Sequence, residues 1–256
     1  MQEIINQLID TIRAATANKT PLRIRGGGSK DFYGGPLRGE AFAVTACRGI
    51  VDYEPTELVI TARAGTPLLD IEAALRERRQ MLAFEPPHFG PAATLGGCIA
   101  AGLSGPRRPY VGAVRDFVLG VRMLDGKGDD LRFGGRVMKN VAGFDVSRLM
   151  AGSLGTLGVI LEVSLKVLPL PVAETTLRFE KTAAEALAAI NTWAAQPLPL
   201  SATAWSRDEL AVRLSGAGAA VGQIDGCAAR SCRCADDRMG RGGALARGRL
   251  RHADHA

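Results

Sequence analysis

The sequence predicts an α+β protein, in which helices and strands follow one another without a regular repeat. Its central part indicates this most clearly, because glycines spaced three residues apart, from Gly152 to Gly158, lead straight into a strand. That strand is marked by strict alternation of apolar residues at Val159, Leu161, Val163, Leu165 and Val167. Residues 172–214 add a β-α-β-β pattern. Bare backbone at the glycine turn suits close approach of a flat or phosphorylated ligand, with a tight packing contact as the alternative.

Length and composition limit the class of protein. A chain of 256 residues, 46% of them hydrophobic, is long enough for one large domain or two small ones. No apolar run reaches the roughly 18 residues of a membrane span. The first residues, Met1-Gln-Glu-Ile-Ile, lack the basic region of a secretory signal. Five cysteines, three of them crowded near the end, do not suggest a disulfide framework, so a reducing, cytoplasmic location is expected.

The net charge of +6 does not predict a nucleic-acid partner. Half of the excess lies in the last 40 residues, where seven arginines stand beside four aspartates. From Ala217 onward the chain has no aromatic residue, lysine or glutamate and follows no apolar period. We expect residues 216–256 to be a disordered or out-of-frame tail. Its cysteines and histidines match no usual zinc-ligand spacing, so no metal is expected.

Helical and strand patterns fill the first 135 residues. Residues 4–12 place isoleucines and a leucine on one helical face. Thr66 is expected to cap a helix that has Pro67 at its first position. The turn Asp125-Gly126 predicts a hairpin between residues 117–124 and 130–133. Further strands are expected at 22–25, 41–46, 50–53 and 58–63, with helices at 98–103 and 145–150.

Two more glycine-rich loops have the chemistry of anion sites. The first, Arg25-Gly-Gly-Gly-Ser-Lys30, follows a strand, so its successive amides can point inward while Ser29 and Lys30 add a hydroxyl and a charge. It is not a Walker A loop, in which Lys precedes Ser or Thr; a flexible loop with a solvated lysine is the alternative. In the second, a proline-stiffened stretch from Glu85 to Pro91 precedes Thr94-Leu-Gly-Gly97 at a helix start.

Four motifs in order, residues 25–30, 86–97, 114–120 and 152–160, make the chain resemble the FAD-binding domain of the vanillyl-alcohol oxidase and p-cresol methylhydroxylase (PCMH) flavoprotein family. Within that family it is most similar to the FAD-binding, E-type subunits of bacterial glycolate oxidases. The second likeness depends on residues 25–33 and on Lys139-Asn-Val-Ala-Gly-Phe-Asp-Val-Ser-Arg-Leu-Met150.

The resemblance implies a division of the chain. Residues 1–171 would form a PCMH-type FAD-binding domain of two α+β subdomains that clasp an extended FAD. Residues 172–215 would be part of an α+β cap, truncated after β-α-β-β. In this cap Thr182 and Glu185 predict a capping box, and Leu187, Ile190 and Ala194 are expected to form the buried stripe of its helix.

The resemblance also implies which residues bind FAD. Backbone groups and side chains of the three glycine-rich loops would contribute, together with Arg115. The implied set is Arg25, Gly26, Gly27, Gly28, Ser29, Lys30, Pro87, Thr94, Gly96, Gly97, Arg115, Gly152, Ser153, Gly155, Thr156, Gly158 and Ile160. FAD is expected to bind without a covalent link, because members with covalent flavin carry a histidine in or near these loops. Here the only histidine before the tail is His88.

The implied function is a subunit of a glycolate or 2-hydroxy acid oxidase that makes glyoxylate. Electrons would pass to a partner iron–sulfur subunit, in a complex that also holds a sister FAD-linked subunit and lies in the cytoplasm or peripherally at the inner membrane. His88 is a candidate acid or base, with a loop-fixing role as the alternative. Arg107 and Arg108 are candidates for the substrate carboxylate, with a solvated basic loop as the alternative. A non-catalytic subunit that scaffolds a sister flavoprotein is the second reading, and a nicotinamide-linked Rossmann enzyme is disfavoured by the missing fingerprint.

Overall fold

The structure is a computed structural model that describes residues 1–135 and 145–218. The chain divides into two compact units, each treated separately below. Unit 1 contains residues 1–108 and 112–169, and unit 2 contains Pro109–Val111 and the chain from Leu170. The division falls close to the predicted boundary at residue 171. The interpretation of the two units as an FAD-binding domain and part of a cap stays a prediction at this stage.

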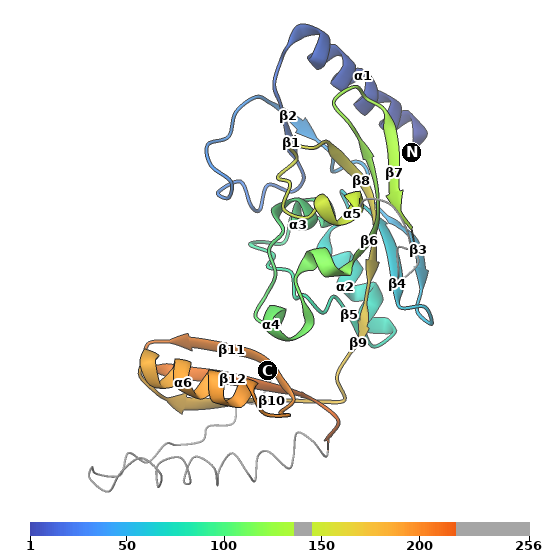
Figure 1. Cartoon of the computed structure of the whole chain (residues 1–256). Helices are drawn as coiled ribbons and strands as arrows, with labels where there is room; N and C mark the ends of the chain where they lie inside the picture. Colours follow the sequence, from blue (N-terminus) through green and yellow to red (C-terminus); the bar gives the residue numbers. More distant parts are fainter. Residues whose placement is uncertain (136–144, 219–256) are drawn as a thin grey trace, which may run out of the picture. The chain divides into compact units, whose positions relative to one another are not determined.

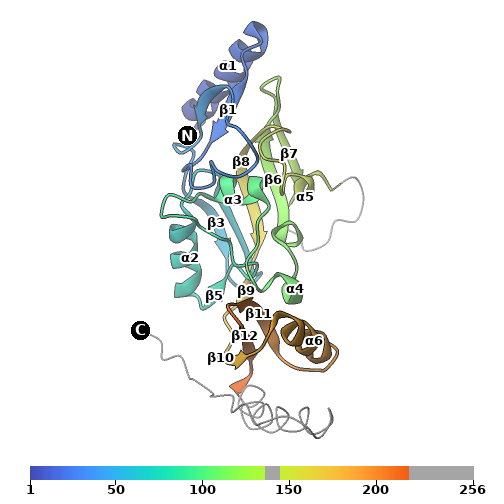
Figure 2. The same ribbon diagram turned by 90° about the vertical axis from the view of Figure 1, so that its left-hand side faces the viewer.

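Unit 1 is built around a five-stranded antiparallel sheet with strand order β3-β4-β8-β6-β7. Figures 1 and 2 show α2 and α3 on one side of this sheet. A parallel pair β1-β2 and a short antiparallel pair β5-β9 complete the strands. The helices are α1 (Gln2–Asn18), α2 (Leu68–Glu77), α3 (Leu95–Ala101), the 3-10 turn η1 (Val114–Phe117) and α5 (Val146–Leu149). The short helix α4 (Arg108–Val111) begins in unit 1, and its last three residues belong to unit 2. The strands are β1 (Leu22–Arg25), β2 (Glu40–Ala43), β3 (Ile50–Glu54), β4 (Val59–Arg63), β5 (Gln80–Met81), β6 (Val118–Leu124), β7 (Asp130–Gly134), β8 (Val159–Lys166) and β9 (Leu168–Pro169).

Helix α1 packs on the same core as β2 and the ends of β6 and β8. Its apolar stripe, Ile5, Leu8 and Ile12, is buried against residues that include Phe42 and Leu161. At its other end Thr16 donates its hydroxyl to the Gly126 carbonyl (2.8 Å) in the β6-β7 turn, beside which α1 lies in Figure 1. The amphipathic pattern thus predicts the buried face, although the helix runs beyond the expected residues 4–12 at both ends.

Charged side chains connect neighbouring strands of the sheet. Glu162 on β8 accepts from Arg122 Nη1 on β6 (3.2 Å) and lies 3.8 Å from Arg63 Nε on β4. Arg122 also forms a bidentate pair with Asp130 on β7, with nitrogen–oxygen distances from 2.6 to 3.2 Å. These contacts connect the side chains of four adjacent strands, β4, β8, β6 and β7.

Two local predictions in unit 1 are wrong. Thr66 does not cap α2: its hydroxyl contacts the Gly49 amide and carbonyl, and Pro67 is the N-cap residue. Helix α3 begins at Leu95 rather than Cys98, because Thr94 already supplies the cap. The predicted hairpin is confirmed, because β6 and β7 pair antiparallel. In its turn Gly128 has a left-handed φ of +77°, and the Asp125 carboxylate accepts from the amides of residues 127 and 129.

Unit 2 has the predicted β-α-β-β order. Its strands pair antiparallel in the order β10-β12-β11, and Thr182 and Glu185 form the predicted capping box. Arg207 and Asp208, both with left-handed φ, make the tight turn between the last two strands. The elements are β10 (Ala173–Glu180), α6 (Ala183–Ala194), β11 (Leu200–Ser206) and β12 (Glu209–Gly216).

The buried face of α6 differs from the predicted stripe. Ile190 packs on the sheet as expected, but Leu187 is 62% exposed and Ala194 is also exposed. The contacts come instead from Ala186, Ala189 and Trp193, because these share one face with Ile190 at helical spacing. The helix therefore covers one face of its own sheet, whose buried cluster is Leu177, Ala186, Leu210, Val212 and Leu214.

Both tryptophans of the chain lie in unit 2. Trp193 packs against Phe179 with ring centroids 5.4 Å apart, and Trp205 donates its indole N–H to the Lys181 carbonyl (2.8 Å). The predicted class, α+β, is confirmed by the two units together.

Some predictions concern parts of the chain that the structure does not describe. Residues 139–144 of the motif 139–150 lie outside the described residues, as do residues 219–256 of the tail with all its cysteines and histidines. Among the helices of the described residues, none is both long and apolar enough to cross a membrane.

Candidate functional site

The first two glycine-rich loops pack directly against each other. A Cβ on Gly27 would overlap the carbonyl oxygen of Ala92, and a Cβ on Gly26 would overlap the Thr94 hydroxyl. At position 28, in contrast, glycine is favoured by the backbone conformation, because φ is +72°. The structure thus brings the predicted anion cradle into contact with the predicted helix start. The glycines at 26 and 27 are there because any side chain would separate these two loops.

The 26–30 loop keeps a row of amides available to an anion. Within the described residues, the amides of Gly27, Gly28, Ser29 and Lys30 donate no hydrogen bond. All four residues are partly buried. Backbone groups of this kind are normally paired, so a row of amides without protein acceptors fits a phosphate ligand. Arg25 folds back beside Gly28 and pairs with Asp31 at 2.9 Å.

The amides at the start of α3 are used within the chain. The Thr94 hydroxyl accepts from the Gly97 amide (3.4 Å), and the Gly96 amide donates to the Ala64 carbonyl (2.7 Å). A Cβ on Gly96 would lie 2.7 Å from the Ala64 Cβ. Gly96 therefore serves the close packing of α3 on the sheet, and the amides of the 26–30 loop are better placed as phosphate donors.

The glycine turn before β8 combines packing and open backbone. Gly152, Gly155 and Gly158 all have positive φ, of 86°, 78° and 144°. A Cβ on Gly158 would overlap the Leu124 carbonyl oxygen, so this glycine serves packing, whereas a Cβ on Gly152 would meet nothing within 4 Å. Ser153 has a buried hydroxyl without a partner among the described residues. An unpaired buried hydroxyl beside open backbone again fits a polar ligand.

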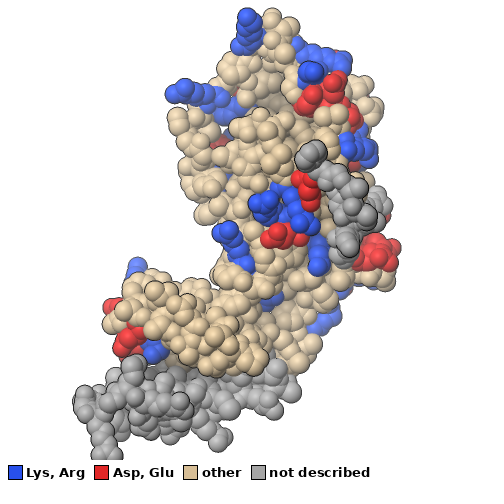
Figure 3. Space-filling model, in the orientation of Figure 1, with Lys and Arg blue, Asp and Glu red and all other residues tan. Residues whose placement is uncertain are grey.

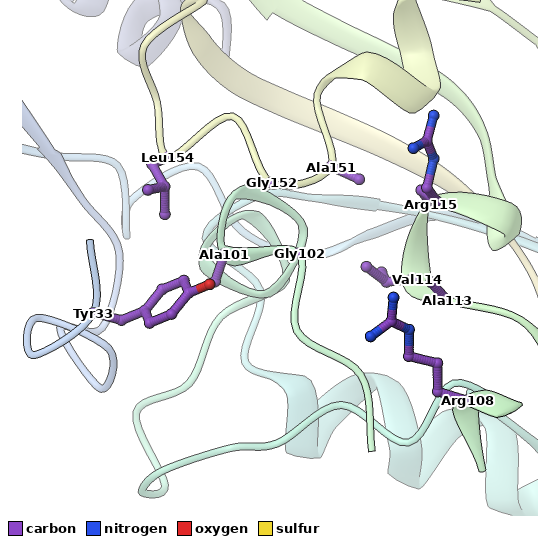
Figure 4. A pocket seen from close by; sticks show the side chains of 10 residues that line it. All are labelled: Tyr33, Ala101, Gly102, Arg108, Ala113, Val114, Arg115, Ala151, Gly152 and Leu154. Carbon is purple, nitrogen blue, oxygen red and sulfur yellow. The ribbon is translucent and has the colours of Figure 1, made fainter. Parts of the chain in front are cut away.

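The glycine turn before β8 borders a cavity of about 250 Å³ in unit 1, whereas no residue of the 26–30 loop or of Thr94–Gly97 lines it. The cavity contains two of the seventeen implied cofactor residues, Arg115 and Gly152, and one of the three catalytic candidates, Arg108. Figure 4 shows Tyr33 and Leu154 on one side of the end of α3 and the two arginines on the other. The lining residues are Tyr33, Ala101, Gly102, Arg108, Ala113, Val114, Arg115, Ala151, Gly152 and Leu154.

The two cavity arginines differ from Arg107. Within the described part of the chain, neither Arg108 nor Arg115 forms a side-chain hydrogen bond or an ion pair, and both are exposed. Arg107 is only 6% exposed, lies 3.6 Å from a Glu85 carboxylate oxygen through its Nε and does not line the cavity. Of the two adjacent candidates for an anionic group, the geometry therefore favours Arg108. On the face drawn in Figure 3, basic and acidic side chains alternate, without one continuous basic surface.

His88 lies outside the cavity lining. Its Nε2 is 2.9 Å from Glu72 Oε1 on α2, and its carbonyl accepts from Lys30 Nζ at 3.4 Å. These contacts favour the loop-fixing alternative for His88 over the acid–base role. Lys30 also lies above the Phe89 ring, 5.9 Å from its centroid, and burial lowers the pKa of its ammonium. Burial raises the pKa of the Cys98 thiol, on α3, to about 12, so this thiol stays protonated and unreactive.

The donor set fits part of an FAD. Unpaired amides, an orphaned hydroxyl and two guanidinium groups suit phosphate or carboxylate oxygens, and the small residues at 101, 102 and 152 leave room for a flat group. A volume of about 250 Å³ lies below the roughly 300–1,000 Å³ of pockets that enclose whole small molecules. The sequence reading missed Tyr33 and Leu154, although Tyr33 follows the 26–30 loop and Leu154 stands inside the glycine turn.

Comparisons with known proteins agree with this reading. The profile of the family described as "FAD binding domain" matches residues 3–134. The chain is similar to glycolate oxidase subunit GlcE of Escherichia coli (strain K12), with 56% identity over 209 residues that cover 82% of this chain and 60% of GlcE. It is also similar to glycolate oxidase subunit GlcD of Bacillus subtilis (strain 168), with 34% identity over 128 residues, half of this chain and 27% of GlcD.

A solved structure shares the fold. Alkyldihydroxyacetonephosphate synthase superposes with a TM-score of 0.68 at 18% identity, over 87% of this chain and 47% of that one. The chain therefore spans 60% or less of the length of each of these proteins. The resemblance inferred from four sequence motifs is confirmed, as are the expected fold and FAD as the cofactor. The chain belongs to the FAD-binding domain family, of the PCMH type found in the E subunits of glycolate oxidases.

Proposed function

We propose that this chain is the FAD-binding subunit of an oxidase complex that converts glycolate, or a related 2-hydroxy acid, to its 2-oxo acid. The observation that carries the proposal is the 56% identity to GlcE over 209 residues, which cover 82% of this chain. Two polar features of the site agree with it. The 26–30 loop offers amides without protein acceptors, and the cavity offers two unpaired guanidinium groups.

Each part of the site has a role in this proposal. The amides of residues 27–30 and the Ser153 hydroxyl would hold the diphosphate of FAD, since successive amides and a hydroxyl are natural phosphate donors. Gly152 would let the cofactor approach the backbone, because no side chain stands there. Arg108 would bind the substrate carboxylate or a cofactor oxygen. Bound FAD supplies the redox chemistry by accepting a hydride from the carbon that bears the substrate hydroxyl.

The proposal includes a complex. As the resemblance implies, the partners are a sister FAD-linked subunit and an iron–sulfur subunit that receives the electrons. We place the complex in the cytoplasm, with peripheral attachment to the inner membrane as the alternative. Non-covalent binding of FAD and the cap role of unit 2 belong to the same proposal.

One observation favours a second candidate function. Oxidation of a hydroxy acid needs a base for the hydroxyl proton, yet none of the ten cavity-lining residues is a histidine, aspartate or glutamate. A subunit that binds FAD without turnover, and supports a sister flavoprotein that holds the substrate, agrees with this lining. In that case Tyr33 would be a contact for the cofactor rather than a proton acceptor.

Anaerobic reduction separates the two functions. The FAD-loaded chain is mixed with glycolate in the absence of oxygen, first alone and then after co-purification with its complex, and the flavin absorption bands are followed. Bleaching in the chain alone supports the catalytic function. Bleaching only in the complex, together with normal FAD content in the chain alone, supports the scaffolding function. Absence of FAD from the purified chain and from its complex would contradict both.

A further inference from the structure

Two consecutive arginines lie in opposite environments. Arg107 is 6% exposed, whereas Arg108 is exposed and lines the cavity. Flexible arginine side chains at the surface sample many rotamers, so one that serves a site is normally held in place by its surroundings. Within the described residues Arg108 has no side-chain partner that could hold it. Its position must therefore come from the backbone that carries it.

Glu85 fixes that backbone through Arg107. One carboxylate oxygen accepts from the Arg107 amide at 3.0 Å, and the other lies 3.6 Å from Arg107 Nε. Glu85 itself has a left-handed φ of +49°, which is uncommon for a side chain of this size and persists only where neighbours enforce it. A Cβ on Gly105 would overlap the Glu85 carbonyl oxygen. The two backbones are therefore in direct contact beside the ion pair.

Phe84 adds two more contacts to the same stretch. Its carbonyl accepts from the Gly105 amide (2.8 Å), and its ring packs on Phe117 with centroids 5.5 Å apart. Within the same stretch, the Val114 amide donates to the Ser104 hydroxyl at 2.9 Å. Residues 104–117, here named the arginine segment, are thus attached near both ends to the buried Phe84 and the partly buried Glu85. This segment carries both cavity arginines, Arg108 and Arg115.

We propose that Glu85 and Arg107 form a positioning pair that fixes the arginine segment, so that Arg108 faces the cavity and binds an anionic oxygen group. The proposal rests on the proposed function for the identity of the ligand. The shared chemistry is a phosphate or carboxylate oxygen, which FAD supplies through its diphosphate and a 2-hydroxy acid through its carboxylate. Glu85 and Arg107 contact neither ligand; they act through Arg108.

Glu85 supplies the opposite charge for the buried guanidinium group of Arg107. An arginine at this depth is costly unless its charge is matched and its hydrogen bonds are made. A pair of this kind adds little net stability compared with apolar residues, but it fixes one arrangement of the backbone. Arg107 is thereby kept away from the anion, and the adjacent arginine is left to contact it.

A double-mutant cycle tests the proposal. The full chain is prepared as wild type, Glu85→Ala, Arg108→Ala and the double variant, with Glu85→Gln as the conservative change. Asp130→Ala is the control, because it removes a partly buried carboxylate–arginine pair on the sheet, among residues that do not line the cavity. Three dissociation constants are measured by flavin fluorescence and absorption: for FAD, for riboflavin, and for glycolate added to the FAD-loaded protein.

If Glu85 acts by positioning Arg108, the effects of the two substitutions on the binding free energy of one of the three ligands are not additive. Loss of a hydrogen bond to a charged group predicts about a tenfold weaker affinity for Arg108→Ala. We expect Glu85→Ala to weaken the same ligand about equally and the double variant to be no weaker than either single variant. Glu85→Gln, which keeps an acceptor for the Arg107 amide, should recover most of the affinity. Weaker affinity for FAD but not for riboflavin would show that Arg108 binds the diphosphate. Weaker affinity for glycolate would show that it binds the substrate carboxylate.

Several results would overturn the proposal. One is that the losses of affinity from the two single substitutions multiply in the double variant for all three ligands. Another is that Arg108→Ala binds all three ligands as wild type does. The third is that Asp130→Ala loses as much affinity as Glu85→Ala. If Glu85→Ala does not fold, Gly105→Ala replaces it in the cycle, since its added Cβ would push the arginine segment away from the Glu85 backbone without removing a charge. If the effects on FAD affinity are non-additive and glycolate does not bind to any variant or to wild type, the result would contradict the proposed substrate but support the positioning pair.

Discussion

The carbonyl oxygen of Ala92 occupies the space where a side chain on Gly27 would have to lie. Residue 27 belongs to the cradle after β1 and residue 92 to the loop before α3, so two loops distant in sequence are in backbone contact. The φ of Gly27 is not left-handed, unlike that of Gly28. Glycine is required at 27 for the approach of another backbone rather than for its own conformation.

Gly27→Ala should therefore weaken FAD binding by at least about tenfold, because even a methyl group must push the two loops apart, and overpacking of this kind costs about 1–3 kcal/mol. Gly126→Ala is the matched control: no atom lies within 4 Å of the added Cβ, and the φ of Gly126 is not left-handed. FAD titration by fluorescence quenching measures both. Wild-type affinity in Gly27→Ala would show that this contact does not shape the site.

Flavin should be released from the protein by acid. No histidine or cysteine lines the cavity, and the Cys98 thiol is buried and protonated. After precipitation with trichloroacetic acid, the yellow chromophore is expected in the supernatant, and chromatography should identify it as intact FAD. Colour that remains with the washed pellet would demonstrate a covalent bond and contradict the non-covalent prediction.

The two described cysteines should resist alkylation in the native protein. Cys47 and Cys98 are each 1% exposed, and burial raises the pKa of both thiols, to about 12 for Cys98. Thiolate is the reactive form, so iodoacetamide at pH 8 should label neither peptide until the protein is unfolded. Peptide mass spectrometry with and without urea measures this. Rapid native labelling of Cys98 would mean that α3 opens to solvent.

Asp130→Asn should destabilise unit 1 in a pH-dependent way. Hydrogen bonds from Arg122 hold the pKa of Asp130 below its usual value, so its contribution to stability is full above pH 4 and is lost as the pH falls through the lowered pKa. Because the side chain is 31% exposed, we expect about 1 kcal/mol at pH 7. Urea unfolding at pH 7 and at pH 3 should show the difference between variant and wild type shrinking in acid.

Asp129→Asn is the control for that measurement. Its side chain makes no hydrogen bond or ion pair within the described residues, so its unfolding free energy should match wild type at both pH values. A pH-independent loss in Asp130→Asn would mean that packing, rather than charge, stabilises this position.

Two substitutions on α6 distinguish its buried and exposed faces. Ile190→Ala should cost about 2 kcal/mol, because Ile190 packs on the buried cluster, whereas Leu187→Ala should change stability by less than about 0.5 kcal/mol, since Leu187 is 62% exposed. Tryptophan fluorescence during urea unfolding measures both, as the two tryptophans lie in unit 2. Equal losses would show that Leu187 is covered in solution.

Sequence alone predicted most of the helices and strands and singled out the three glycine-rich loops, because period and glycine position are local signals. The assignment of these loops to FAD stays a prediction. Sequence alone failed where a residue's partner is distant. Thr66 fits a helix cap by its neighbours, yet it bonds to Gly49 across a turn. The stripe of α6 was misplaced because Leu187 is more apolar than Ala186, although the alanine lies on the packed side.

In the candidate site, too, the sequence does not reveal contacts between residues that are distant in the chain. Arg107 and Arg108 are indistinguishable as letters in a basic loop, and only the contact with Glu85, 22 residues earlier, separates them. Tyr33 and Leu154 carry no motif of their own. They join the cavity because the chain around Gly34 approaches Leu154, where an added Cβ would lie 3.0 Å from its side chain.

The central position of β8 between β4 and β6 determines the order in which the molecule can form as it is synthesised. Val59 pairs with Lys166, so β4 waits for a partner about 100 residues downstream, and closing so long a loop is slow. Until residue 166 emerges from the ribosome, the β3-β4 and β6-β7 hairpins each expose an edge that can pair with another chain. Yield of the soluble protein should therefore depend on translation speed and chaperone supply through the stretch that ends with β8.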